Sequence, residues 1–567
     1  MKKPATRSNS FLKVGIGFII LFLLNIAGSF LFTRLDLTTE KRHSLTPETV
    51  QMIEDLDDVV FIRVYLEGEF PADFKRLRSA VKERLDELKA YAGKKIQYEF
   101  INPSENPDQK TRQQTWQRLV ERGLEPTEIT IQGKDALERK IIFPGAIMSY
   151  RGKEVALQIL RSQETAPGPE TMNSSINNLE YNIANNIRRL TEKTSKRVGI
   201  LAGQGELGEQ DIADFKKAAS DLYTVEEVRI DSQVSALKNF DCLIIAKPDS
   251  QFTEKNKFII DQFIMKGGTV LWCVDGISAN MDSLAGTSKQ EVLGMSQNIN
   301  LNDMLFTYGA RIESNLIIDR SCAPIALKVG QFGDQPNYKL FPWYFHPVLI
   351  SNGKHPITVN IDPVVTQFVS KVDTVGFPFI KKTVLLSTSE NSIIQRAPVR
   401  INLGIVGLKL DFKRAGSGPQ PVAVLLEGKF KSAYPPERID GRITSSKMIN
   451  YQKEAIKPTK MIVIGDGDVI RNPVDKGRNL FYPLGYDKNL KRKVYGNREF
   501  LLNSLNYLLD DSGLIAVRSR EIKLRKLNEE KLLNERTRWQ VINVVTPLVL
   551  VIAMGVILFF IRKKKYA

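Results

Sequence analysis

Hydrophobic positions follow three different patterns along this chain. Two uninterrupted apolar runs lie near the ends, segments of period two and period 3.6 alternate over much of the middle, and residues from about 300 to 455 hold several strand-like runs in a less regular order. A period of two predicts strands and a period of 3.6 predicts helices, so their alternation is typical of an α/β fold. The pattern therefore predicts a large α/β ectodomain flanked by two membrane helices.

The first part of the middle region, residues 34–165, has the order strand, helix, strand. Residues 59–66 alternate as a strand, residues 70–93 have helical spacing, and "KIQYEFINP" is the next strand. A helix near 107–122 and a hairpin turning at 151–153 follow. This order predicts a thioredoxin-like domain. Its loop "YLEGEFP" contains no cysteine, so we expect a scaffold without the redox chemistry of that fold.

Composition separates this part from a second α/β domain. A linker helix is predicted at 166–195, after the proline- and glycine-containing stretch "ETAPGPE". Beyond it the order strand, helix, strand, strand, helix, strand predicts a parallel sheet with its loops at the carboxyl ends of the strands. We assign 196–512 to this domain, with a β-rich insertion at about 300–455, and 513–540 to a charged connecting helix.

The apolar runs predict membrane anchors at 1–33 and 541–567. Each contains about 20 residues without a charge, which approaches the length needed to cross a hydrocarbon core. Basic residues lie at both outer ends, and the positive-inside tendency places such ends in the cytoplasm and the ectodomain in the periplasm of an inner-membrane protein. For the first run, "AGS" leaves a cleaved signal peptide as an alternative. The ends of the runs and the basic residues behind the second are Val14, Phe32, Val541, Ile561, Arg562, Lys563 and Lys564.

Charge and the rarer residues exclude several functions. The net charge is +17, but 64 acidic residues are mixed among 81 basic ones, and we expect no nucleic-acid partner. The uncharged runs from Val14 to Phe32 and from Val541 to Ile561 contain no acidic residue, histidine or arginine, so they are not expected to form an ion pathway. Three cysteines and three histidines lack the spacing of a metal site, and the chain has no phosphate-binding motif of an ATPase. We expect neither metal nor cofactor.

The stretch "VGILAGQGELGEQD" has the letters of a dinucleotide-binding turn. Such a turn offers backbone N–H groups and a positive helix end to a diphosphate. Here Glu206, Glu209 and Asp211 crowd that end, and three carboxylates would repel a diphosphate. The favoured interpretation is a structural glycine-rich turn between a strand and a helix.

Two further constellations carry alternative functions. Ser278 in "GISAN" is a near miss to a nucleophile elbow, and with His346 or His355 as base it predicts a serine hydrolase. Gln204, Glu206 and Asp275 follow predicted strands, where α/β sheets usually hold ligands, and they form a candidate cleft for glycan or peptidoglycan fragments. Asp466 and Asp468 in "GDGD" are interpreted as a strand end and a helix cap, because the further ligands of a calcium loop are missing.

Several segments together resemble the gliding-motility-associated ABC-transporter auxiliary proteins, the substrate-binding-like GldG family. These are "LDLTTEKRHSLTPET", "RVGILAGQGE", "MIVIGDGDVI", "NREFLLNSLNYLLDDSGLIAVRSREIKLRKLNEEK" and "PLVLVIAMGVILFFIRKKKYA". The resemblance implies a middle domain similar to one in an intraflagellar-transport protein, with no known catalytic residues. It also implies two partners, a permease subunit of the GldF type and a cytoplasmic ATPase of the GldA type. We therefore expect a noncatalytic subunit of an ABC-type complex required for gliding motility.

Overall fold

The computed structural model forms two compact units, Met1–Arg520 and Glu521–Ala567. The structure describes residues 15–23, 26, 44–132, 137–160, 169–192, 195–285, 291–333, 335–351, 353, 355–408, 410–435, 437, 450–475, 477–510, 512–519 and 529–566. The predicted ends of the first anchor, Val14 and Phe32, lie outside this set, although residues 15–23 are helical.

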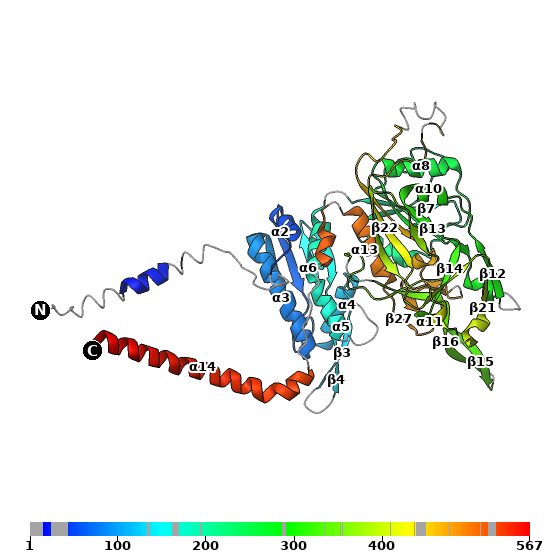
Figure 1. Ribbon diagram of the computed structural model, residues 1–567. Helices are drawn as coiled ribbons and strands as arrows, with labels where there is room; N and C mark the ends of the chain where they lie inside the picture. The colour runs from blue at the N-terminus through cyan, green and yellow to red at the C-terminus, as the bar shows by residue number, and fades with distance from the viewer. Residues whose placement is uncertain are drawn as a thin grey trace. The chain divides into compact units, whose positions relative to one another are not determined.

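The larger unit begins with a four-stranded sheet and its helices (Figure 1). Its elements are α2 (Pro47–Glu54), β1 (Val60–Val64), α3 (Ala72–Ala92), η1 (Gly93–Lys95), β2 (Ile96–Phe100), α4 (Gln109–Glu121), β3 (Thr127–Gln132), β4 (Leu137–Ile142), β5 (Gly145–Tyr150), β6 (Lys153–Gln158), α5 (Pro169–Asn177) and α6 (Leu179–Thr191). The strand order is β2-β1-β5-β6, with β1 parallel to β2 and antiparallel to β5. The expected strand, helix and strand are thus present, and β3 and β4 form a separate two-stranded ribbon.

Local sequence signals explain where several helices begin. Thr46 precedes α2, and its hydroxyl accepts a hydrogen bond from the Thr49 N–H at 3.4 Å. Asp108 precedes α4 and accepts from the Thr111 N–H at 2.9 Å. These side chains satisfy N–H groups that have no partner within the first turn of a helix.

A larger sheet follows, built from the parallel strands predicted by the sequence and from antiparallel strands of the insertion. Its parallel part and covering helices are β7 (Arg197–Ala202), α7 (Ala213–Ser220), β8 (Thr224–Arg229), β9 (Cys242–Ala246), α8 (Glu254–Met265), β10 (Thr269–Cys273), α10 (Asn302–Tyr308), β23 (Thr459–Ile464) and α13 (Asn497–Leu509). The order β8-β7-β9-β10-β23 is parallel throughout. After β7 the chain adds β8 on one side and β9 on the other, so the order in which strands are added reverses between β7 and β9.

The insertion extends this sheet with strands that run antiparallel. Its elements are β11 (Ile277–Ser278), α9 (Met281–Ala285), β12 (Glu291–Ser296), β13 (Ala310–Ile312), β14 (Asn315–Asp319), β15 (Cys322–Phe332), β16 (Gln335–Ser351), β17 (Val364–Val365), β18 (Val372–Thr374), β19 (Ile380–Ser387), β20 (Ser392–Arg396), β21 (Val399–Asn402), η2 (Leu403–Gly407), α11 (Phe412–Ala415) and β22 (Pro421–Gly428). β22 pairs antiparallel with β23, and β19 and β16 continue outward. The expected parallel sheet is therefore the parallel half of a mixed sheet. A parallel neighbour needs a crossover connection, usually a helix, whereas antiparallel strands do not.

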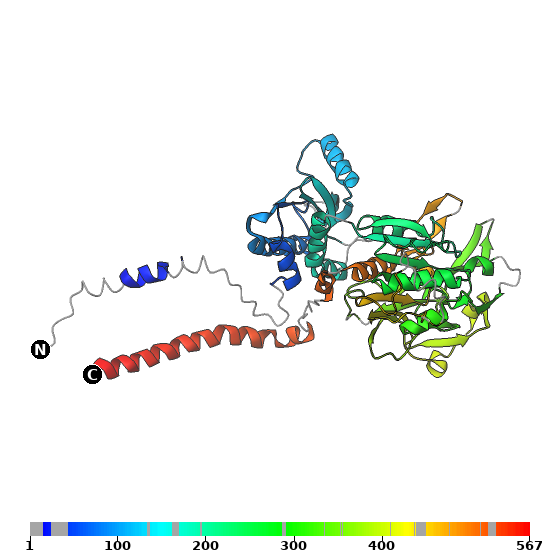
Figure 2. The same cartoon turned by 90° about the horizontal axis from the view of Figure 1, so that it is seen from above.

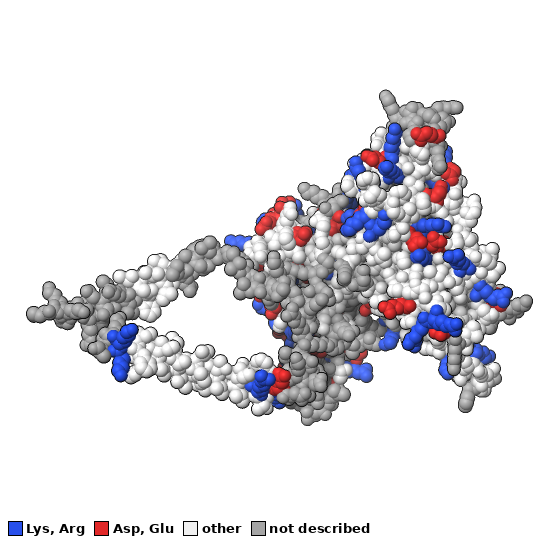
Figure 3. All heavy atoms as spheres, viewed as in Figure 1, with Lys and Arg blue, Asp and Glu red and all other residues white. Residues whose placement is uncertain are grey.

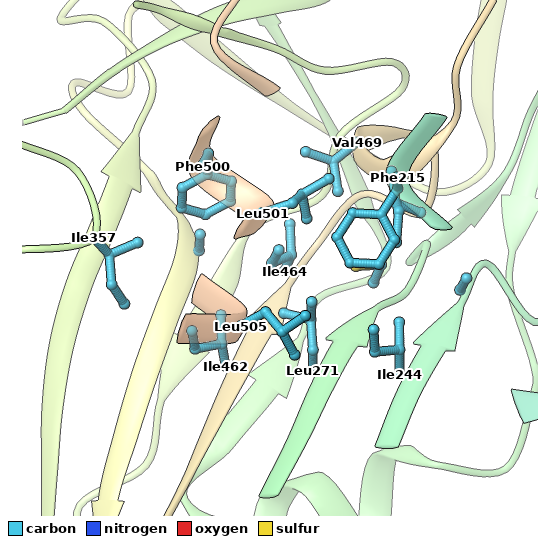
Figure 4. Packing of buried hydrophobic residues seen from close by; sticks show 14 of the residues in the cluster. Phe215, Ile244, Leu271, Ile357, Ile462, Ile464, Val469, Phe500, Leu501 and Leu505 are labelled. Carbon is cyan, nitrogen blue, oxygen red and sulfur yellow. The ribbon is translucent and has the colours of Figure 1, made fainter. Parts of the chain in front are cut away.

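Alternating side chains of the central strands supply two separate cores. Ile244 of β9, Leu271 of β10 and Ile462 of β23 pack with α7 and α13 on one face (Figure 4). Their sequence neighbours, such as Ile245 and Trp272, pack with α8 and α10 on the other face. Because both faces are covered, the strands are apolar at nearly every position, as expected for parallel strands.

After α13 the chain forms small elements and then one long helix. The small element after α13 is η5 (Leu514–Ser519). Five others lie between β23 and α13: η4 (Asp468–Ile470), β24 (Val474–Asp475), β25 (Leu480–Phe481), β26 (Tyr486–Asp487) and β27 (Arg492–Lys493). The long helix, α14 (Glu529–Tyr566), contains the predicted second anchor from Val541 to Ile561 and continues through Pro547. The start of the segment predicted as a connecting helix is instead the 3-10 helix η5.

One stretch of α14 is long and apolar enough to cross a membrane. It covers Glu535–Lys564, 30 residues, and the most apolar 18-residue window within it has a mean hydropathy of 2.9. In Figure 3 the middle of this helix shows neither basic nor acidic side chains, whereas charges gather toward its ends. Arg562, Lys563 and Lys564 lie in the last turns. The helix supports membrane anchoring at this end of the chain.

Candidate functional site

The carboxyl edge of the parallel strands gathers most of the polar residues singled out from the sequence. Gln204 and Glu206 follow β7, Asp275 follows β10, and Asp466 and Asp468 follow β23. Carboxyl ends of parallel strands meet at one edge of a sheet, and the point where the strand order reverses is the usual ligand crevice. Here that point lies between β7 and β9.

Lys247, directly after β9, organises the middle of this edge. Its ammonium lies 2.9 Å from the Asp275 carboxylate and also forms an ion pair with Asp468. Asp275 further accepts a hydrogen bond from the Gly467 N–H. The side chains of all three ion-pair partners are largely buried. The predicted cleft residue Asp275 is therefore neutralised by its own chain.

Asp466 is fully buried beside this ion pair. It accepts hydrogen bonds from the N–H groups of Asp468, at 2.8 Å, and Gln367, at 3.0 Å. Burial raises the pKa of Asp466 well above its ordinary value, and the carboxylates of Asp468 and Asp275 raise it further. Burial likewise raises the pKa of Asp275, although Lys247 opposes this shift. Asp466 and Asp468 thus follow the end of β23, as the sequence favoured, but the 3-10 helix η4 that begins at Asp468 has Gly467 as its N-cap and no side-chain cap hydrogen bond.

The chemistry of Lys247 differs from that of a catalytic lysine. Burial alone would lower the pKa of its ammonium, but Asp275 and Asp468 raise the pKa overall. A lysine that acts as base or nucleophile needs a lowered pKa. Lys247 also holds a φ of 54°, in a region that residues with a side chain seldom adopt. These features describe a structural ion pair, which the sequence did not single out. The charged residue directly after the apolar strand "CLIIA" was the available signal.

The glycine-rich turn after β7 is fastened to the loop after β9. The carbonyl of Gln204 accepts hydrogen bonds from the N–H groups of Asp249 and Ser250, both at 3.0 Å. Gly205 has a φ of 73°, and a Cβ at that position would collide with the Asp249 carboxylate. Glycine is therefore required by backbone conformation and by the close approach of the two loops.

Some polar groups of this turn form hydrogen bonds with each other. The Gln204 N–H donates to the Glu206 carboxylate at 2.7 Å, in a loop where a bound diphosphate would need such donors. Burial raises the pKa of Glu206. The Gln204 side chain is buried, and among the described residues neither its Oε1 nor the Oε1 of Glu206 has a hydrogen-bond partner. The structure brings these two residues together, while Asp275 is engaged by Lys247.

Ser278 lies in a different setting from that of a nucleophile elbow. It belongs to the short strand β11 and pairs with Met295 of β12. An elbow serine lies on a sharp turn between a strand and a helix. His346 packs against Trp343 and Phe368, and burial lowers its pKa to about 4. The contacts seen within the described residues do not pair this histidine with Ser278.

Thiol and metal chemistry find no support at this edge. Cys242 and Cys273 are buried in β9 and β10, and the three cysteines are unpaired. Burial raises the pKa of Cys242 to about 12, which keeps the thiol protonated and inert. Within the part of the chain that the structure describes, no group of three or more histidine, cysteine or acidic residues is arranged to hold a metal.

Comparison with known proteins adds a family. Residues 195–504 match the model of the family described as an ABC-type uncharacterized transport system, and residues 39–149 match a domain of unknown function. An uncharacterized protein of Borreliella burgdorferi is 20% identical over 576 residues, which cover 99% of each chain. The solved mmIFT52 N-terminal domain is 13% identical and covers 56% of this chain and 99% of its own, with a TM-score of 0.30.

Proposed function

This chain belongs to the auxiliary component family of ABC-type uncharacterized transport systems, and we propose that it acts there as a noncatalytic subunit anchored in the membrane at both ends. The observation that carries the proposal is α14, in which the uncharged run from Val541 to Ile561 continues from a charged helical segment without a break. In this proposal both termini are cytoplasmic and the ectodomain is periplasmic. The partners are a permease subunit of the GldF type and an ATPase of the GldA type, and the complex serves gliding motility.

The junction around α6 supports a mechanical role for the ectodomain. Thr46, at the start of α2, donates its N–H to Glu180 of α6 at 2.7 Å. At the other end, Leu514 of η5 packs in one hydrophobic cluster with Tyr181 and Ala184 of α6. The two ends of the described ectodomain are therefore held by the same helix. In this proposal α6 is the element at which movement of the anchors reaches the larger unit, because α6 contacts β5 and β6 and its Tyr181 accepts a hydrogen bond from Asn506 of α13.

Topology is tested with protease added to spheroplasts. Tags at either terminus are expected to resist digestion while the ectodomain is degraded. A protected ectodomain would contradict the proposed orientation. Copurification of the permease and the ATPase with the full chain tests the partners, and a variant that ends before Glu535 is expected to lose both.

Mechanical coupling is tested separately from assembly. A flexible Gly-Ser linker inserted after Asn534 interrupts α14 ahead of its apolar stretch. We expect membrane insertion and copurification to persist and gliding to stop. An insertion of equal length made from helix-forming residues is the matched control and should preserve more motility. Normal gliding with the flexible linker would reject coupling through this helix.

A ligand cleft at Gln204, Glu206 and Asp275 is the second candidate function. It is favoured by the two buried oxygens of Gln204 and Glu206 that have no partner among the described residues. The ligand would be a glycan or peptidoglycan fragment. Titrating the full chain with soluble wall fragments should shift the amide signals of these residues, and Glu206→Gln should weaken the response. Unchanged signals would reject the cleft.

A further inference from the structure

A cavity of about 490 Å³ lies at the carboxyl ends of β1 and β2. Its walls come from the loops after these two strands, from α4 and from β4. Figure 2 shows α4, in light blue, projecting beside the first sheet. The carboxyl edge of parallel strands is where open α/β sheets hold ligands. The cavity therefore occupies the place where such a sheet would hold a ligand.

Trp116, on the apolar side of the cavity, carries a donor without a partner among the described residues. Tyr65, Trp116 and Phe143 line the cavity and belong to one hydrophobic cluster. The indole Nε1 of Trp116 is buried and has no hydrogen-bond partner among the described residues. An indole N–H can only donate, and a buried donor without a partner costs free energy. An acceptor supplied by a ligand would remove this cost.

The charged side chains around the cavity leave an excess of positive charge. Arg112, Arg139 and Lys140 line it, and so do two glutamates. Glu67 is neutralised by Arg78 of α3, whose Nε lies 2.9 Å from its carboxylate. The Nη1 of Arg139 lies 3.5 Å from the Oε1 of Glu128. Both side chains are well exposed, so this ion pair is weak. The lining therefore favours an anionic group.

One wall of the cavity is a strand with an unused edge. Arg139 to Phe143 are consecutive lining residues that belong to β4 or follow it. Among the described residues β4 pairs only with β3. A strand with one partner leaves alternate backbone N–H and C=O groups on its other side, and such an edge accepts an added strand.

We propose that this cavity binds an extended peptide bearing a carboxylate, which adds to the free edge of β4. Arg112 and Arg139 bind the carboxylate, and Trp116 donates its N–H to a peptide carbonyl while its ring contacts an apolar side chain. Consecutive backbone contacts along β4 favour a peptide over a sugar acid, which has no strand to add. The carboxylate is the chain terminus or an acidic side chain. This site goes beyond the proposed transporter role and does not depend on the transporter partners.

The test uses the full chain in lipid nanodiscs and a fluorescein-labelled hexapeptide of alternating valine and threonine. Fluorescence anisotropy compares three forms of the peptide: a free carboxyl end, an amidated end, and an amidated end with one internal aspartate. We expect the amidated peptide to bind at least about tenfold more weakly than the better of the two carboxylate forms, because it lacks a charge-assisted hydrogen bond. The better carboxylate form identifies the source of the anion. Equal binding of all three would overturn the proposal.

Variants assign the binding to this cavity. Arg112→Ala should weaken binding by about tenfold, and Trp116→Phe, which keeps a ring but removes the donor, by about fivefold. Arg118→Ala is the matched control, since Arg118 lies on the same helix outside the lining. Arg139→Ala serves as a second test, because that side chain is well exposed and its loss leaves the fold intact. Equal affinities for Arg112→Ala, Arg139→Ala and Arg118→Ala would refute the site.

Hydrogen exchange tests the added strand. The bound peptide should slow amide exchange across residues 138–142 of β4 and leave β6 unchanged. A glucuronic-acid disaccharide is the rival probe. If it competes with the peptide and the exchange of β4 does not change in either complex, the cavity binds a sugar acid and the peptide proposal fails.

Discussion

The larger unit contains two carboxyl edges of parallel strands, and the polar side chains at one edge are paired whereas those at the other leave a cavity. After β9, β10 and β23, Lys247 forms ion pairs with Asp275 and Asp468, Arg471 also pairs with Asp468, and backbone N–H groups satisfy Asp466. After β1 and β2 a cavity remains, with the Trp116 N–H unpartnered and basic residues in excess. Topology places a ligand crevice at both edges. The comparison shows that internal pairing fills the first edge around Lys247, whereas the second edge keeps a cavity.

We call the edge after β9, β10 and β23 the closed edge, and the edge after β1 and β2 the open edge. The largest loss of stability is expected from removing Lys247, the cation at the closed edge. Lys247→Met leaves Asp275 and Asp468 buried without their shared partner, and breaking such a pair costs about 3–5 kcal/mol. Hydrogen exchange of the β9 and β10 amides in the full chain measures the free energy of opening of this domain. Lys255→Met on the exposed side of α8 is the control. A loss no greater than that of the control would mean that the ion pair does not hold the edge.

The next effect is expected from the protonation of His346 in acid. His346 has a pKa of about 4 in the folded protein against an ordinary value of 6.5, because burial disfavours its charged form. The unfolded chain therefore binds the proton more tightly, so this stability is complete above pH 6.5 and is lost as the pH falls toward 4. We expect a loss of about 1–3 kcal/mol between these limits from His346.

The contribution of His346 is separated by a variant. His355 has the same direction of shift, to a pKa of about 4, and packs against Tyr507 away from the ion pair. Amide exchange of β10 in the wild type, His346→Gln and His355→Gln should show a flatter pH response for each variant. Identical profiles for His346→Gln and the wild type would show that this histidine does not titrate on unfolding.

A loss of similar size is expected from weakening the contact between the loops after β7 and β9. Gly205→Ala forces a side chain into a left-handed backbone position and against the Asp249 carboxylate, at a cost of about 1–3 kcal/mol. Asp249→Gly in the same chain removes the collision but keeps the backbone strain, so it should restore part of the stability. Thermal unfolding of the three proteins measures this. Full stability in Gly205→Ala would contradict the observed loop contact.

The open edge should tolerate substitution with the smallest change. Arg139→Ala removes only an exposed ion pair with Glu128, and the free energy of unfolding should change by no more than about 0.5 kcal/mol. Hydrogen exchange of β5 reports on the stability of this part. A loss comparable with that of Lys247→Met would remove the contrast between the two edges, because the open edge would then be structural as well.

Much of the architecture was determined by the sequence alone. Short continuous apolar runs, with a helical run between two of them, located β7, β9, β10 and α8, because parallel strands covered on both faces are apolar at nearly every position. The apolar run from Val541 to Ile561 likewise predicted the membrane-length helix α14. The family resemblance was supported at the level of an ABC-type auxiliary component, while the gliding role stays a prediction.

Only the tertiary structure decided the pairings between distant residues. The sequence could place Asp275 and Asp468 at strand ends but could not show that Lys247 lies between them, since an ion pair across 221 residues leaves no local pattern. The sheet direction beyond β23 was open for the same reason, because antiparallel pairing depends on how a long insertion returns. The cavity beside Trp116 arises where α4 and β4 meet two loops, and an empty volume is a property of packing that composition and periodicity do not encode.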